Sequence, residues 1–88
     1  MTSKEAIEES CDRLKSLLLA KNASYGDSAF EPINVFSKGS AEDQILTRID
    51  DKLARIARGS EFPGDDTLMD LAGYLVLLMA LRLKKASP

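Results

Sequence analysis

The stretch Asp65–Lys85, DDTLMDLAGYLVLLMALRLKK, decides the fold of this chain, because its apolar residues recur at helical spacing on nearly every side. We expect a helix from about residue 66 to 85, capped by Asp65 or Asp66 and preceded by a break at Pro63-Gly64. One apolar stripe is formed by Leu68, Leu71, Leu75 and Leu78, another by Leu77 and Leu81, and Met69, Val76 and Leu83 fill much of the rest. A helix that is apolar nearly all round must be covered nearly all round.

The surroundings of this stretch indicate burial in protein and no membrane partner. Its most apolar part, from Leu68 to Leu83, contains Asp70 and Arg82 and is shorter than the ~20 residues that are needed to span a bilayer. The start, MTSKEAIEES, has no apolar run after its charges, so we expect no signal peptide. Cys11 is the single cysteine of the chain, which suits a reducing compartment. We therefore expect a cytoplasmic protein.

Two further helices are predicted upstream, and no strand pattern competes with them. The first runs from about residue 3 to 21, with Thr2 or Ser3 as its cap and Thr2 and Glu5 at the spacing of a capping box. The second runs from about residue 41 to 58, between a cap at Ser40 and a stop at Gly59. The inner stripes are Ile7, Cys11, Leu14 and Leu18 on the first, and Ile45, Ile49, Leu53 and Ile56 on the second.

Fold class and assembly follow from these three segments. The 88 residues predict one all-α domain, residues 1–88, with a structured loop over residues 22–40. Two short helices cannot easily cover a third that is apolar nearly all round. We therefore expect a three-helix unit that completes a helical bundle by forming a homo-oligomer, a dimer or a tetramer.

Composition excludes several classes of chemistry. The net charge is −2, from 12 basic and 14 acidic residues, which argues against broad nucleic-acid binding. The chain has no histidine and one cysteine, which excludes the usual zinc sites and histidine-assisted nucleophiles. A metal ion, if one is bound, would need carboxylate ligands, which favours magnesium, manganese or calcium.

Acidic residues and a tyrosine form the main candidate site on the last helix. Asp66, Asp70 and Tyr74 are four residues apart and share one side of it. Buried carboxylates need cations or strong donors, so this side predicts a metal or substrate site near the start of the helix. The plainer interpretation is that Asp66 is only an N-cap and that Asp70 pairs with an arginine.

The middle helix adds Asp50 and Lys52 at the borders of its apolar face, and Lys52 could neutralise Asp70 or meet a phosphate. The charges of Asp51, Arg55 and Arg58 are interpreted as a solvated face. The acidic group Glu5, Glu8, Glu9 and Asp12 suits the dipole at the start of the first helix.

The segment KNASYGDSAF, residues 21–30, predicts a polar turn with packed aromatics. Asn22, Asp27 and Ser28 surround Gly26, which can supply a positive φ angle. Tyr25 and Phe30 either stack on a base or close the end of the bundle.

Three segments in order resemble a known family. KNASYGDSAFEPINVFSK, ILTRIDDKLARIARG and DDTLMDLAGYLVLL, between about Lys21 and Leu78, are similar to the nucleotide-modification-associated domain of bacteriophage and bacterial proteins, first described as a domain of unknown function. That family looks like a relative of the all-α nucleoside triphosphate pyrophosphohydrolases of the MazG and dimeric dUTPase type. Those enzymes hold magnesium on acidic residues of bundled helices and release pyrophosphate from a triphosphate.

The resemblance implies roles for particular residues. Asp66 and Asp70 would be ligands of magnesium or manganese, with Asp50 or Asp51 completing the set. Lys52 would be a cation facing the phosphates. The substrate-binding residues would be Lys21, Asn22, Tyr25, Asp27, Phe30 and Tyr74.

One departure from that pattern bears on activity. The pyrophosphohydrolases carry a paired-glutamate motif, E-x-x-E, on an earlier helix. Its closest matches, Glu5 with Glu8 or Glu9 with Asp12, do not lie on the face that periodicity turns inward. The expectation is therefore a nucleotide-binding protein with a possible magnesium-dependent pyrophosphohydrolase activity. The alternative is a non-enzymatic phage accessory module that binds a host or replication protein through its apolar helix.

Overall fold

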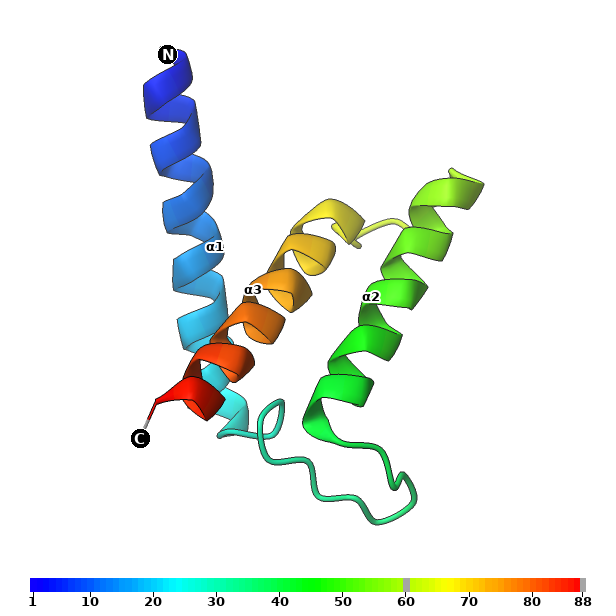
Figure 1. Cartoon of the computed structure of the whole chain (residues 1–88). Helices are drawn as coiled ribbons and strands as arrows, with labels where there is room; N and C mark the ends of the chain where they lie inside the picture. The colour runs from blue at the N-terminus through cyan, green and yellow to red at the C-terminus, as the bar shows by residue number, and fades with distance from the viewer. Residues whose placement is uncertain (60, 88) are drawn as a thin grey trace.

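The structure, a computed structural model, describes residues 1–59 and 61–87. This part of the chain is all-α and contains no strand: its helices are α1 (Ser3–Tyr25), α2 (Ala41–Arg58) and α3 (Thr67–Ala86) (Figure 1). Among the described residues, none of these helices combines the length and the apolar character needed to cross a membrane.

Polar side chains begin each helix as the sequence predicts. The Thr2 hydroxyl accepts a hydrogen bond from the Glu5 amide at 3.1 Å while the Glu5 carboxylate accepts one from the Thr2 amide at 3.3 Å, which confirms the capping box. Ser40 caps α2, and of the two aspartates considered for α3 it is Asp66 that accepts from the Met69 amide, at 3.0 Å. Helix α2 ends at Gly59, whose φ of +66° is left-handed.

Helix α1 is one turn longer than predicted, and this changes the setting of two candidate residues. It continues past Lys21 to Tyr25, so Asn22 and Tyr25 lie on a helix instead of in a loop. The chain leaves the helix at Gly26, whose φ is +63°. The Asn22 side chain donates to the Gly26 carbonyl at 3.3 Å, which satisfies one of the oxygens left free at a helix end.

Helices α2 and α3 lie side by side and antiparallel, and the small core of the described chain lies between them (Figure 1). Ile45, which is 3% exposed, packs there with Ile49 and Leu81. Ion pairs connect the two helices at both ends: Arg82 Nε lies 3.1 Å from Glu42 Oε1, and Lys52 Nζ lies 3.5 Å from Asp70 Oδ2.

Helix α1 contacts the rest of the molecule much less, and none of its residues is buried. It crosses α3 at Gly73, where an added Cβ would lie 3.3 Å from Leu18 Cδ2 and 3.8 Å from Leu14 Cδ1. The missing side chain therefore allows the two helices to approach closely. The N-terminal half of α1 continues beyond this crossing, away from the other helices (Figure 1).

The connection between α1 and α2, residues 26–40, is held at its beginning by Lys84 and near its end by Gln44, whose side chain donates to Asn34 Oδ1 at 2.8 Å and to the Gly39 carbonyl at 3.0 Å. Lys84 of α3 lies 3.8 Å from the Asp27 carboxylate and 4.9 Å from the centre of the Phe30 ring. Ile33, Val35 and Phe36 are exposed, and Phe36 is 98% exposed. The loop that the sequence predicts to be structured therefore leaves these three apolar side chains unpacked within one chain.

Candidate functional site

A pocket of about 210 Å³ lies between the C-terminal half of α1 and the N-terminal half of α3. It is lined by Leu17, Leu18, Lys21, Asn22, Tyr25, Gly26, Ser28, Ala29, Met69, Asp70, Gly73, Tyr74 and Leu77. Leucine and methionine side chains supply much of this lining, together with several polar side chains. An apolar pocket with a few converging polar groups is the usual form of a small-molecule site.

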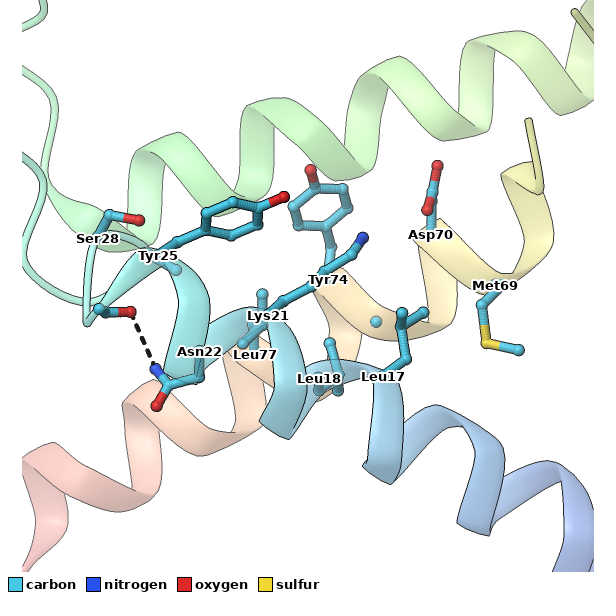
Figure 2. A pocket seen from close by; sticks show the side chains of 13 residues that line it. Leu17, Leu18, Lys21, Asn22, Tyr25, Ser28, Met69, Asp70, Tyr74 and Leu77 are labelled. Atoms are coloured by element: carbon cyan, nitrogen blue, oxygen red, sulfur yellow. Dashed lines mark hydrogen bonds between the residues drawn. The ribbon is translucent and has the colours of Figure 1, made fainter. Parts of the chain in front are cut away.

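Helical spacing places the main polar residues of the pocket. Lys21 and Tyr25 are four residues apart on α1, and Asp70 and Tyr74 are four residues apart on α3, so each pair shares a helix face. The close crossing at Gly73 brings the two faces together. Figure 2 shows Lys21, Tyr25 and Tyr74 directed toward the same space, with Asp70 beyond them.

Two lysines and one carboxylate set the charge at the pocket. Asp70 is paired with Lys52 of α2 at 3.5 Å, and these side chains are 30% and 12% exposed. Lys21 has no ion-pair partner among the described residues. The local sum is one positive charge, which favours an anionic group over a cation.

The two tyrosines differ in how firmly they are held. Tyr74 is half-buried and packs against the core formed by α2 and α3. Tyr25 is 69% exposed at the end of α1. One aromatic wall is therefore fixed by the core, while the other is open to solvent and has surface available for a ligand.

Asn22 is oriented by two hydrogen bonds from its amide nitrogen. Nδ2 donates to the Gly26 carbonyl at 3.3 Å and to Asp27 Oδ1 at 3.0 Å (Figure 2 shows the first). Both donors of the amide group are engaged, so Asn22 Oδ1 is the atom available to a ligand, as a hydrogen-bond acceptor.

The pocket brings together five of the residues predicted from the sequence: Lys21, Asn22, Tyr25, Asp70 and Tyr74. Lys52 is not part of the pocket lining, but it contacts Asp70, which is.

The other predicted residues lie elsewhere. Phe30 packs under Lys84, and Asp27 contacts Lys84 and Asn22. Asp50 is exposed on α2, and Asp51 lies 3.9 Å from Arg48 on that helix. Asp66 accepts from the Met69 amide as the helix cap. Asp66 is thus the N-cap that the plainer interpretation expects, and Asp70 pairs with Lys52 where an arginine was considered.

The carboxylates of one chain do not fit a resident magnesium or manganese ion. Within the described residues, no group of three or more histidine, cysteine, aspartate or glutamate side chains is placed to hold a metal ion. Asp66 is engaged by a backbone amide and Asp70 by Lys52. The predicted set Asp50, Asp51, Asp66 and Asp70 is therefore not gathered within a single chain.

The acidic residues of α1 do not reach the pocket either. Glu8 lies 3.9 Å from Lys4, and Glu9 lies 2.6 Å from Arg13. These pairs lie on the half of α1 that extends beyond the crossing. Their contacts agree with a solvated helix face.

The apolar side of the pocket was missed by reasoning from the sequence. Leu18 and Met69 were interpreted only as apolar residues of their helices, and Leu17 and Gly73 were not considered. A glycine inside a strongly apolar helix, as in DLAGYLV, is a signal of close backbone approach. That signal could have located the crossing, although not the helix that crosses there.

Comparison with known proteins gives no match for this chain: not to a family model, not to a curated protein and not to a solved structure. The described part of the chain is therefore a small all-α protein with a pocket whose lining includes two tyrosines and a lysine.

Proposed function

We propose that this protein binds a nucleotide, with a nucleoside triphosphate as the preferred class, in the pocket between α1 and α3. The observation that carries the proposal is the gathering of Lys21, Asn22, Tyr25 and Tyr74 around one apolar cavity (Figure 2). Aromatic rings and an amide oxygen can contact the base of a nucleotide, and a lysine can contact its phosphates.

The aromatic part of the site suits a base. Tyr25 offers an exposed ring, and base stacking on an aromatic side chain contributes about 1–3 kcal/mol. Asn22 Oδ1 is available to accept a hydrogen bond from an exocyclic amine. Adenine, guanine and cytosine carry such an amine.

The cationic part suits phosphate groups. Lys21 at the pocket edge is the nearer cation, and Lys52 would become available to a phosphate if the Asp70 contact opened. The cavity of about 210 Å³ is smaller than the roughly 300–1,000 Å³ of typical ligand pockets, so one chain encloses only part of a nucleotide. The phosphates would extend past Lys21 toward solvent or a second chain.

The proposal concerns binding, and no step of it passes through a metal ion. The resemblance to pyrophosphohydrolases leaves hydrolysis of the bound triphosphate as a further possibility to be measured. Such an activity would need carboxylates from more than one chain, because no group of them within residues 1–59 and 61–87 of one chain is placed to hold a metal ion.

The test is calorimetry and thermal shift with each deoxynucleoside triphosphate, with magnesium and with a chelator. A ligand of the native state raises Tm by mass action. The affinities of deoxyadenosine and of pyrophosphate, measured separately, show how much of the binding comes from the nucleoside and how much from the phosphates. The released products are assayed in the same samples.

A pair of matched variants tests whether a nucleotide that binds does so in this pocket. We expect Lys21→Ala to weaken triphosphate affinity about tenfold, because it removes one charge-assisted contact. Lys15→Ala, on an exposed part of the same helix, is expected to leave the affinity unchanged. The absence of binding by any nucleotide, or an equal loss in both variants, would contradict the proposal.

A second candidate function has its own support. The apolar surface of α3 that α1 and α2 leave exposed fits an interaction module that binds another protein. Since a second copy of the chain would cover the same surface, the homo-oligomer is the partner that we propose first.

A further inference from the structure

Helix α3 has three apolar faces, and only two of them are covered. Leu71, Leu78 and Leu81 face α2, and Gly73 faces α1. The third face consists of Leu68, Leu75, Val76, Met79 and Leu83, and is called the outer stripe below.

The outer stripe is continuous and exposed. At 100° per residue its members fall within an arc of about 100°. From its first to its last residue it extends about 22 Å along the helix. Leu68 is 72% exposed, Met79 69% and Leu83 70%. Scattered apolar residues are normal on a surface, but a continuous stripe of this length marks an interaction site.

The exposed area of the chain indicates how large the missing contact is. The surface measures 6829 Å², whereas a closed monomer of 9.6 kDa exposes about 5,100 Å². The surplus of about 1,700 Å² per chain, doubled, falls within the roughly 2,000–5,000 Å² buried in obligate homodimers. The radius of gyration, 14.6 Å against about 12 Å for a compact domain of this length, shows the same openness. A contact with a second copy of the chain is therefore of the size that the surplus requires.

The helix dipoles favour one of the two ways in which two copies could pair. The charged side chains near the ends of α3 are engaged within the chain, where Asp70 pairs with Lys52, Arg82 with Glu42 and Lys84 with Asp27. Antiparallel packing of two α3 helices places the N-terminal end of each helix, where the dipole is positive, beside the C-terminal end of its partner, where the dipole is negative. Parallel packing would place like ends together.

We infer that the outer stripe is the contact surface of a homodimer in which two α3 helices pack antiparallel about a two-fold axis near Leu75 and Val76. The inference names the surface for the oligomer proposed above and does not depend on nucleotide binding, because no residue of the stripe lines the pocket. A two-fold axis at this place makes the contact self-complementary, since Leu68 of one copy then faces Leu83 of its partner.

Light scattering and sedimentation test the surface. We expect the wild-type chain to have twice the mass of the 9.6 kDa monomer, or a multiple of that dimer. Leu75→Glu brings two carboxylates together at the axis and is expected to halve the mass, with an unchanged helical circular dichroism spectrum. Ile33→Glu, in the exposed loop, is the control and is expected to keep the wild-type mass.

Cross-linking tests the orientation without weakening the fold. In a Cys11→Ser background, Leu75→Cys lies at the axis and is expected to form an intermolecular disulfide on oxidation. Leu83→Cys is expected to remain free, because the antiparallel arrangement places the two copies of residue 83 about 22 Å apart along the helix. A monomeric wild type, a mass unchanged by Leu75→Glu, dissociation by Ile33→Glu, or cross-linking at residue 83 would each overturn the inference.

Discussion

The pair of helices α2 and α3 differs from the single helix α1 in how much of it is buried and in how it is held. The pair contains the buried side chains Ile45, Ile49 and Leu81 and has ion pairs at both ends. Helix α1 buries no residue and depends on one close crossing at Gly73. The contacts between α2 and α3 therefore supply most of the stability of the fold, whereas α1 contributes one side of the candidate site. The difference predicts that substitutions in the core between α2 and α3 change mainly stability, whereas substitutions on the pocket side of α1 change mainly the candidate site.

The largest expected effect comes from the core of the pair. Ile45→Ala removes a side chain that is 3% exposed, and we expect it to lower the free energy of unfolding by about 2–5 kcal/mol. Ile33→Ala, the same substitution at an exposed loop position, is expected to stay within about 0.5 kcal/mol of wild type. Urea unfolding at a fixed protein concentration measures both. Equal effects would show that the pair is not the stabilising unit.

The next effect is at the crossing. Gly73→Val places a branched side chain where Cβ alone would be 3.3 Å from Leu18, and we expect a loss of about 1–3 kcal/mol together with loss of nucleotide binding. Ala57→Val, on an exposed part of α2, is expected to cost only a few tenths of a kcal/mol. Unfolding and calorimetry are measured on both variants. Unchanged binding in Gly73→Val would mean that α1 does not form the site.

An intermediate effect is expected at the ion pair beside the pocket. Asp70→Asn removes the partner of Lys52, whose side chain is 12% exposed, and we expect a loss of about 1–2 kcal/mol. Asp51→Asn breaks the exposed contact with Arg48 and is expected to cost less than about 0.5 kcal/mol. A double-mutant cycle with Lys52→Met isolates the pairwise energy. A coupling energy near zero would show that the ion pair between Lys52 and Asp70 does not stabilise the fold.

The smallest effects are expected from substitutions of the helix caps, and they distinguish α3 from α1. Asp66→Ala at the start of α3 is expected to cost about 1 kcal/mol, the usual value for a cap on a packed helix. Thr2→Ala is expected to cost a few tenths in global stability, because the first turns of α1 can open locally. Hydrogen exchange should show faster exchange at the start of α1 in that variant. A global loss equal to that of Asp66→Ala would show that α1 unfolds together with the pair.

Local features of the chain could be predicted because short-range rules fix them. The capping box at Thr2, the cap at Ser40 and the stop at Gly59 were correctly placed. The end of α1 was not, because Asn22 and Ser24 are weak helix formers and the side-chain contact from Asn22 to the Gly26 carbonyl is not visible in the sequence.

The candidate site was partly visible in the sequence. Spacing by four residues brought Asp70 and Tyr74 onto one face of the last helix, and both line the pocket. Phe30 was grouped with Tyr25 because both are aromatic residues in one segment, yet the chain turns between them and Phe30 packs under Lys84. The pairing of Asp70 with Lys52 was one of two alternatives, and the antiparallel arrangement of α2 and α3 selected it.

The sequence by itself determined the three helices, their caps and the excess of apolar surface on the last one, because these depend on residues within a few turns of one another. Only the tertiary structure decided which faces of α3 are covered, where α1 crosses and which polar groups meet at the pocket. Those outcomes depend on contacts between residues 18 and 73, 52 and 70, or 42 and 82, whose distances in space no local pattern encodes.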